Sequence, residues 1–571
     1  MEERRLLLAV ALSLVVLTAY SLLFAPAVPP PAASPTPVLS PAPAAATPAP
    51  GATPAAAPGT NPPAEAATAA RGPATEAAAA SVADERERRI EVAASEYTVA
   101  FTNRGARLVS WTLSRYKDAR GRPEEMVPAQ SQALRPLDVE TGDAAVDARL
   151  REALFRPSAE SLSVSGDAPQ SLRFAFADGG LQAEKTITFQ PRGLTAVQVS
   201  VRRGGQPLPV RLLWGPGIGN ATPEEREVRG YAEPNGVALI AGGGVQQFTA
   251  SKLPPGGQPL AGVRWVGVES HYFAALFVAP GGVGAAAVRA VTLSPRGEEK
   301  PLTEAVAAVD ASAAEPVQLF VGAKDHQVLA HLGHQLERVV QVGDWIGPIV
   351  VALMGLLRWV HGHVGNWGWS IVLLTVLINL AMAPFRHYSI VNGLKMAKVS
   401  PEMKVIQERY RKVPLMDPRR QQMQEEMGAL YAKHGMSMSS QMTVGCLPIL
   451  LTMPFLFAFY RVLSVLVELR GAPFLWISDL AQKDPLFITP VLMGVSMFAM
   501  QKMTPTAMDP AQQRVMMLMP VMLAGMFLWA PAGLNLYWLT SNLWSILQQW
   551  VEMRVLRPAE APKPARPRRS R

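Results

Sequence analysis

The sequence predicts an α-helical membrane core of six spans joined to a large antiparallel β-sandwich outside the membrane. Three observations lead to this prediction. Only 17% of the 571 residues are charged, against roughly 25% in soluble proteins, and the mean hydropathy is slightly positive. Six apolar runs of 16 to 25 residues are separated by more polar segments. Between the first two runs, residues 86–322 instead carry short alternating patterns that are typical of strands.

Residues 1–25 are expected to form a signal anchor. The apolar run from Leu6 to Ala25 has 20 residues, which as a helix would cross the roughly 30 Å hydrocarbon core of a bilayer. A cleavable signal peptide is the alternative, because Ala25-Pro26-Ala27 has the small residues of a cleavage site. The length of the run and the proline favour the anchor. The single cysteine, Cys446, excludes an internal disulfide, a Cys-rich zinc site and an N-terminal lipid anchor.

Residues 26–85 are expected to be a disordered Pro/Ala-rich tether. From residue 26 to residue 83 the chain contains 15 prolines and 23 alanines. Prolines interrupt both helices and sheet ladders, and alanine-rich sequence offers no large apolar side chains for a core. A semi-extended spacer is therefore predicted.

Residues 86–340 are predicted to form the β-sandwich, followed by a helix at its C-terminal end. Gly, Pro and Asn clusters separate its strand patterns, as in all-β folds. A region of this length can bury a core without disulfides. The predicted strands are 97–103, 108–113, 172–178, 185–190, 196–201, 210–214, 272–278 and 317–322.

Residues 363–552 are predicted to form the membrane core, and the charges set its orientation. The segment 386–441 has ten Lys/Arg against five Asp/Glu, whereas the loop 468–485 has two against three. The basic tail, 553–571, is a second cationic region. Because cytoplasmic loops carry the Lys/Arg excess, both termini are placed in the cytoplasm and the sandwich outside. The predicted core spans are 366–385, 443–467, 486–501, 515–530 and 532–551.

Residues 341–362 are predicted to be an amphipathic helix lying in the membrane interface rather than a seventh span. The apolar run from Trp345 to Val360 has 16 residues and contains Pro348 and Arg358. If it crossed the membrane, both basic regions would face outward. A helix that lies flat satisfies the residues and the charge rule together.

Five strings in the helical region resemble the YidC/Oxa/Alb family of membrane protein insertases. They are VGNWGWSIVLLT (364–375), CLPILLTMPFLFAFY (446–460), VELRGAPFLWISDL (467–480), DPLFITPVLMGVSMFAMQKM (484–503) and LNLYWLTSNLWSILQQ (534–549). The resemblance implies a periplasmic β-supersandwich and a five-span insertase core preceded by the signal anchor. It also implies a hydrophilic groove that opens to the cytoplasm and to lipid.

Polar side chains inside spans are costly, so they normally face protein or water. Thr375 and Asn379 lie four residues apart on one helix face, and Arg386 returns close to that face nearer the cytoplasm unless Pro384 turns it aside. Our candidates for groove lining or substrate contact are Thr375, Asn379, Arg386, Thr452, Met453, Pro454, Phe455, Tyr537, Ser541 and Asn542. Among these, Met453, Pro454 and Phe455 are the substrate-slide residues that the resemblance implies.

Asn379 stands where the family pattern has an arginine. Asparagine offers hydrogen bonds but no charge, so we hypothesise that Arg386 supplies the charge at the mouth of the groove. Under this hypothesis the groove is wet beside Asn379, and a cysteine placed there reacts with reagents from the cytoplasm. The alternative is that Asn379 only joins two helices by a hydrogen bond.

Several other features have two interpretations. Arg461 either snorkels to the outer interface or lines the groove. The many methionines between Met382 and Met526 either adapt to varied client helices or fill the core.

The segment 393–436 is predicted to be a cytoplasmic helical hairpin. Its charged face either receives a substrate or ribosome or is simply solvated. The basic residues of the tail either contact ribosomal RNA or keep the tail on the cytoplasmic side. These residues are Arg566, Arg568, Arg569 and Arg571.

No enzyme motif is present: the sequence lacks GxSxG, GxxxxGK, HExxH and CxxC. His331, His334 and Glu337 recur by threes on an expected helix, where they could share a metal-binding face, but a polar surface explains them better. No catalytic residue, metal or cofactor is therefore predicted.

The resulting functional hypothesis is a multi-pass insertase and chaperone of the bacterial inner membrane, acting alone or with the Sec translocon. Its partners would be nascent inner-membrane proteins, the phospholipid bilayer and the ribosome, but not DNA. A transporter or channel for a small solute is the first alternative, although paired intramembrane charges and inverted repeats are missing. An envelope scaffold that binds a ligand through its sandwich is the second.

Overall fold

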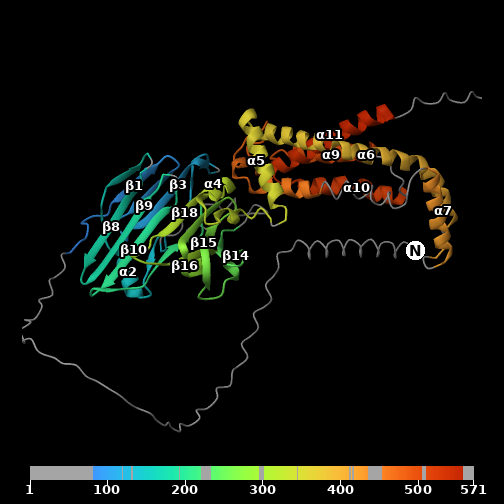
Figure 1. The fold of residues 1–571 in the computed structure, drawn as a ribbon. Coiled ribbons are helices and arrows are strands. Elements are labelled where there is room, and N and C mark those ends of the chain that lie inside the picture. Colours follow the sequence, from blue (N-terminus) through green and yellow to red (C-terminus); the bar gives the residue numbers. More distant parts are fainter. Residues whose placement is uncertain are drawn as a thin grey trace, which may run out of the picture. The chain divides into compact units, whose positions relative to one another are not determined.

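The structure is a computed structural model with a β-rich region followed by a helical region (Figure 1). The predicted anchor, nearly all of the tether and the end of the basic tail lie outside the residues that it describes. It describes residues 81–556 except 119, 130–132, 167, 192, 220–232, 295–300, 344, 411–412, 415–416, 435–452 and 504–509.

The β-rich region consists of two sheets. The five-stranded sheet has the order β4-β3-β2-β1-β7. Its strands are β1 (Arg89–Ala94), β2 (Tyr97–Thr102), β3 (Arg107–Lys117), β4 (Pro123–Glu125) and β7 (Ser161–Val164). The thirteen-stranded sheet has the order β14-β13-β15-β16-β18-β10-β9-β8-β6 along its main path, and β5, β11, β12 and β17 pair off that path.

The strands of the larger sheet are distributed over most of the β-rich region. They are β5 (Val139–Glu140), β6 (Arg156–Pro157), β8 (Gln170–Asp178), β9 (Leu181–Phe189), β10 (Thr195–Arg203), β11 (Gln206–Pro207), β12 (Val210–Trp214), β13 (Asn235–Ile240), β14 (Val245–Thr249), β15 (Gln258–Glu269), β16 (Phe273–Leu293), β17 (Leu302–Ala311) and β18 (Val317–Ala323). The helices of this region are α2 (Ala144–Glu152) and α4 (His326–Leu332), with short 3-10 turns η1 (Ala250–Lys252) and η2 (Leu336–Val340).

All eight predicted strands are confirmed. Side chains that alternate between apolar and polar fit a sheet with one face toward a core, which is why the pattern predicts strands. In β9, for example, every second residue from Leu181 to Phe189 is buried. The prediction of a purely antiparallel sandwich is wrong in one place, since β1 pairs with β7 in parallel. Strands as short as β5, β6 and β11 have too few residues to show a period.

Aromatic side chains fill the space between the sheets. Phe101 of the smaller sheet lies with its ring centroid 5.8 Å from that of Phe174 in the larger sheet, and Trp111 lies 6.4 Å from Phe189. These four side chains are almost completely buried. Large rings bury much apolar area each, which explains how the sandwich holds together without a disulfide.

The helical region begins at α5. Its helices are α5 (Gly347–Val364), α6 (Trp367–Arg409), α7 (Arg419–Lys433), an unlabelled helix at Met453–Val465, α9 (Ile488–Met503), α10 (Pro510–Phe527) and α11 (Ala532–Leu556), with the 3-10 turn η3 (Val467–Leu469). By length and composition, α5 and residues Trp367–Met396 of α6 are long and apolar enough to cross a membrane. Two shorter apolar helices are Met453–Val465 and Met516–Phe527.

The first predicted core span and the first arm of the predicted hairpin belong to one helix, α6. α6 runs without interruption through Pro384 and Pro401 for 43 residues, so the first arm of the hairpin is the continuation of the span. The hairpin itself is present, because Val399 and Met403 of α6 pack against Leu430 and Tyr431 of α7. Neighbouring contacts therefore keep α6 helical where proline on its own would favour a kink.

α5 has 18 residues and both begins and ends later in the sequence than the helix predicted at 341–362. Figure 1 shows it crosswise to α6 and α11 at one end of the helical region. Its Arg358 binds Asp325, which caps the N-terminus of α4, at 3.1 Å and Glu468 at 2.6 Å. Both partners belong to segments that adjoin the sandwich, so Arg358 ties α5 to that end of the helices.

Candidate functional site

A line of polar contacts joins α6 to α11, and we call it the α6–α11 seam: Asn379, Ala383 and Arg386 on α6 with Ser541, Ser545 and Gln548 on α11. Ser541 Oγ donates to Asn379 Oδ1 at 3.3 Å. Arg386 donates to Ser545 Oγ, and Gln548 Nε2 donates to the Ala383 carbonyl at 2.9 Å. Asn379 pairs with Ser541, whereas Ala383 and Arg386, farther along α6, pair with residues farther along α11, so the two helices run in the same direction.

A parallel pair of this kind restricts the topology. α6 and α11 can run in the same direction across a bilayer only if the chain crosses an odd number of times between them. The intervening helices that fit this count are Met453–Val465, α9 and α10. The number of core spans itself stays a prediction.

Asn379 lies inside the protein rather than on an open wall. It is only 4% exposed, and Thr375 on the same helix face is 0% exposed. Asn379 Nδ2 donates to the Thr375 carbonyl at 2.8 Å, and its oxygen accepts from Ser541. This geometry favours the helix-joining interpretation over a water-lined position in the absence of a client.

Asn542 extends the polar contacts to a third helix. Its Nδ2 donates to Ser496 Oγ of α9 at 3.0 Å, and both side chains are buried. Ser496 Oγ in turn donates to the Met493 carbonyl at 2.7 Å. Polar side chains inside spans form such bonds because hydrocarbon offers them no partner.

The apolar candidates lie on a different face. Met453 is 37% exposed and Pro454 and Phe455 are half-buried, while Tyr537 is buried with its ring stacked on Phe459 at 4.2 Å. Tyr537 is therefore held in the core between helices. On α10 the exposed apolar side chains are Leu518, Met519, Val521, Met522 and Met526.

Five of the predicted site residues cannot be placed. Thr452 and the basic tail residues Arg566, Arg568, Arg569 and Arg571 lie outside the described residues. The structure brings Thr375, Asn379, Arg386, Ser541 and Asn542 together in or beside the seam, whereas Met453, Pro454 and Phe455 belong to the helix Met453–Val465.

Arg461 binds the loop that precedes α5. Its Nε donates to the Gln341 carbonyl at 2.8 Å, and its side chain is partly buried. Nearby, Arg470 binds Glu124 of β4 at 2.7 Å and His271 bonds the Ser464 carbonyl at 2.8 Å. Arg461 therefore points toward the sandwich end of its helix, away from Arg386, which agrees with the first of its two interpretations.

Asp484 was missed by the sequence analysis. It is 0% exposed just before α9, where its carboxylate accepts from the Thr489 backbone N–H at 2.7 Å and from Trp476 Nε1 at 3.1 Å. Burial opposes ionisation of Asp484, yet hydrogen bonds from Thr489, Leu486 and Trp476 outweigh it and lower the pKa of the carboxyl. The sequence did contain a signal for this role of Asp484. An Asp-Pro pair begins five residues before Thr489, and such a pair is typical of a helix start.

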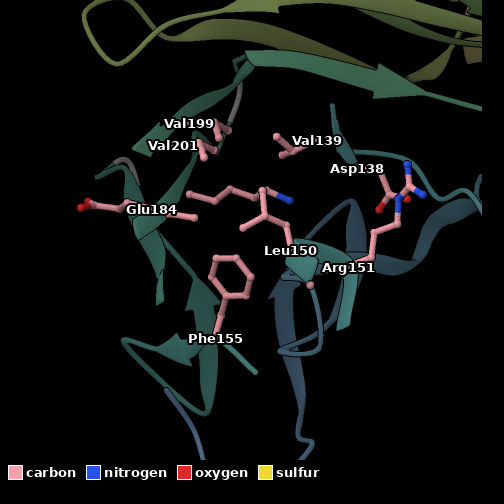
Figure 2. A pocket seen from close by; sticks show the side chains of 11 residues that line it. Asp138, Val139, Leu150, Arg151, Phe155, Glu184, Val199 and Val201 are labelled. Carbon is pink, nitrogen blue, oxygen red and sulfur yellow. The ribbon is translucent and has the colours of Figure 1, made fainter. Parts of the chain in front are cut away.

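A small cavity in the sandwich contains a buried lysine. Leu150, Phe155, Val199 and Val201 surround it (Figure 2), and its volume of about 20 Å³ has room for about one water molecule. Lys185 Nζ donates to two backbone carbonyls at 2.7 Å each. Burial lowers the pKa of Lys185 to about 8. This cavity is too small for a sugar or a peptide side chain.

The three residues considered for a metal site do not share a helix face. α4 ends at Leu332, His334 has a left-handed backbone (φ 54°), and Glu337 belongs to η2. The sequence pattern assumed one continuous helix, which Gly333 interrupts. Among the residues that the structure describes, no three His, Cys, Asp or Glu side chains come together as metal ligands.

Comparisons with known proteins agree with this architecture. A family model described as "60Kd inner membrane protein" matches residues 359–559, and one described as "YidC periplasmic domain" matches residues 89–355. The membrane protein insertase YidC of Geobacter metallireducens is 32% identical over 98% of this chain and 100% of its own length. That of Wolinella succinogenes is 34% identical over 74% of both chains.

A solved structure of an active YidC insertase with its first transmembrane domain resolved is 16% identical, covers 83% of this chain and 94% of that one, and has a TM-score of 0.32. The family assignment depends on the sequence relatives instead. The Geobacter relative extends over both the β-rich and the helical region, and the two family models meet within α5. The chain belongs to the YidC family of membrane protein insertases.

Proposed function

We propose that this protein inserts and folds inner-membrane proteins, with the α6–α11 seam as the polar side of the client path. One observation supports this proposal most. Hydrogen-bonding side chains form a line along helices whose other faces are apolar. It starts at the buried Asn379 and reaches Arg386, which is only partly buried. The relatives named membrane protein insertase supply the functional class.

The proposed topology has six spans, with both termini in the cytoplasm and the sandwich in the periplasm. The parallel pairing of α6 with α11 supports the five core spans. α5 lies in the outer interface, which its ion pairs with Asp325 and Glu468 support. The sixth span is the anchor at residues 1–25, outside the described residues.

In this proposal a client's apolar segment moves along the exposed methionines and other apolar side chains of α10 and of the helix Met453–Val465. Met522 and Met526 are 66% and 62% exposed, so a client helix can reach them directly. Thioether side chains adapt to partners of varied shape. The residues proposed for contact are Met453, Pro454, Phe455, Met519, Met522 and Met526.

The energy of insertion comes from the client. Burying one apolar side chain in lipid releases roughly 1.5–3 kcal/mol, so a span of about 20 such residues releases far more than a short polar tail costs. The seam lowers that cost by offering hydrogen-bond partners and, at Arg386, a positive charge. Neither nucleotide nor cofactor is required in this scheme, and clients with long charged tails would depend on the Sec translocon.

Arg386 is proposed to attract acidic tails, in place of the arginine that the family pattern puts at Asn379. The test uses the purified full-length protein in vesicles without nucleotide and a one-span client whose short tail is either acidic or neutral. Protease protection of the tail measures insertion. We expect Arg386→Ala to reduce insertion of the acidic-tailed client about tenfold, corresponding to one charged hydrogen bond, and to affect the neutral-tailed client less.

Two matched variants separate charge from packing. Ser545→Ala removes the partner of Arg386 but keeps the charge, and Lys398→Ala removes an exposed charge farther along the same helix. Both should insert the acidic-tailed client nearly normally. If Arg386→Ala behaves like Lys398→Ala, Arg386 does not have the proposed role. If vesicles containing the wild-type protein insert no more client than protein-free vesicles, the proposed function itself fails.

A further inference from the structure

A pocket of about 480 Å³ lies between α6 and α11, next to the end of the seam that Arg386 occupies. This volume falls within the roughly 300–1,000 Å³ range of small-ligand sites. Its walls are mostly apolar and include Pro384 of α6 with Trp544, Leu547 and Val551 of α11. Leu547 is 53% exposed and Val551 43% exposed, so the pocket is open on the apolar outer face of α11.

Gln548 and Glu552 also line the pocket and leave acceptor oxygens in it. Gln548 Nε2 donates to the Ala383 carbonyl at 2.9 Å and to Glu552 Oε1 at 2.8 Å, so both donors of this amide are engaged. Its Oε1 is buried and, among the described residues, receives no hydrogen bond. Glu552 Oε2 lies 3.3 Å from His387 Nδ1 and likewise accepts no hydrogen bond there.

Two buried acceptors, one of them on a carboxylate, favour a donor that carries a positive charge. The Glu552 side chain is only 12% exposed, while His387 is 54% exposed and carries charge only when protonated. A buried carboxylate without a full partner is costly. An ammonium group has enough N–H donors for both oxygens, and its positive charge offsets the charge of the carboxylate.

The position along α11 indicates where such an ammonium comes from. Trp550 lies in the same helical segment, and the Arg554 guanidinium lies 3.9 Å from the centre of its ring. A tryptophan followed by an arginine at the end of a span is typical of the headgroup level of the cytoplasmic leaflet. The pocket thus combines an outward apolar opening with an anionic end at headgroup depth.

We propose that this pocket binds the headgroup of an amine-bearing phospholipid, with phosphatidylethanolamine as the test ligand. The ammonium donates to Gln548 Oε1 and Glu552 Oε2, and the upper part of the acyl chains lies along Leu547 and Val551. A choline headgroup carries the same charge but has no N–H to donate. A phosphatidylglycerol headgroup has no cation, so its net negative charge is repelled by Glu552.

The experiment measures lipid binding to the full-length protein by native mass spectrometry, with phosphatidylethanolamine, phosphatidylcholine and phosphatidylglycerol titrated separately. We expect the wild type to bind phosphatidylethanolamine most tightly. Glu552→Gln, which keeps the size but removes the charge, should weaken this binding about tenfold, as expected for one charged hydrogen bond. Glu408→Gln, at an exposed position on α6, is the matched control and should leave binding unchanged.

A steric pair keeps the test decisive if Glu552→Gln alters folding. Val551→Trp fills the pocket and should abolish the lipid preference, whereas Val555→Trp, at a 77% exposed position outside the pocket lining, should preserve it. Equal binding of phosphatidylcholine and phosphatidylethanolamine would overturn the proposal. So would a lysine-bearing client peptide that requires Glu552 while phosphatidylethanolamine does not, because the pocket would then belong to clients.

Discussion

The sandwich buries large apolar side chains, whereas the helical core exposes some of its apolar side chains and buries polar ones. In the sandwich, Phe174 and Trp214 are 0% exposed and charged residues cover the outside. In the helical core, Val521 and Met522 are 63% and 66% exposed, whereas Thr375 and Asn379 are buried. The hydrophobic effect drives the apolar side chains of the sandwich into its core. This driving force is missing where lipid surrounds the protein.

The difference in surroundings determines which contacts stabilise each region. Packing of large rings stabilises the sandwich, as between Phe101 and Phe174. Between the helices, small residues and hydrogen bonds contribute as well: a Cβ added to Gly494 of α9 would lie 2.8 Å from the Ala524 Cβ of α10. Substitutions of the same chemistry should therefore have different consequences in the two regions.

The largest expected effect comes from a buried ring. Phe174→Ala should lower the free energy of unfolding by about 3–5 kcal/mol, because it opens a cavity between the sheets. Phe385→Ala is the control in the helical core, where the side chain is already 52% exposed. Thermal unfolding of the detergent-solubilised protein measures both. Equal losses would contradict the proposed difference between the regions.

Lys185 is a buried charged residue inside the sandwich, and its burial predicts a pH dependence. Its folded-state pKa is about 8 and its ordinary value is 10.5, so between these values the unfolded state binds more protons and stability rises with pH. The total gain is on the order of 3 kcal/mol. Lys185→Met should remove this rise.

The measurement for Lys185 is the difference in unfolding temperature between wild type and variant from pH 7 to pH 10.5. Taking the difference cancels other titrating groups, such as Tyr116, whose pKa burial raises to about 12. A difference that does not change with pH would show that Lys185 has the same pKa folded and unfolded.

A smaller effect is expected from the seam. Asn379→Leu and Ser541→Ala each remove one partner of a bond between helices, and their coupling in a double-mutant cycle should be about 0.6–1.7 kcal/mol. Unfolding in a mild detergent provides the free energies. A coupling of zero would mean that water, rather than Ser541, satisfies Asn379, as a wet groove requires.

The smallest effect is expected on the outer face of α10. Met522→Ala should change the free energy of unfolding by no more than about 0.5 kcal/mol, because lipid or a client surrounds this side chain instead of protein. A client-insertion assay gives the informative readout, since a contact residue should affect insertion without affecting stability. Loss of stability would place Met522 in the core.

The predictable part of this fold is the part with a strong local signal. Alternating side chains determined β8, β9 and β10, and long apolar runs determined α6, α9 and α11, because burial on one face or on all faces leaves a periodic or continuous pattern. The parallel pairing of β1 with β7 and the short edge strands had no such signal. β7 lies far from β1 in sequence and β5 lies far from β12, so only the packed sandwich brings these pairs together.

The candidate site divides in the same way. The sequence alone determined which polar residues lie within spans, since Asn379, Ser541 and Asn542 interrupt apolar runs wherever the chain folds. Only the tertiary structure decided that these side chains bond to one another, that α6 continues through Pro384, and that Gln548 and Glu552 lie in a pocket. A polar atom in a membrane needs a partner, but which partner it finds depends on how the helices pack.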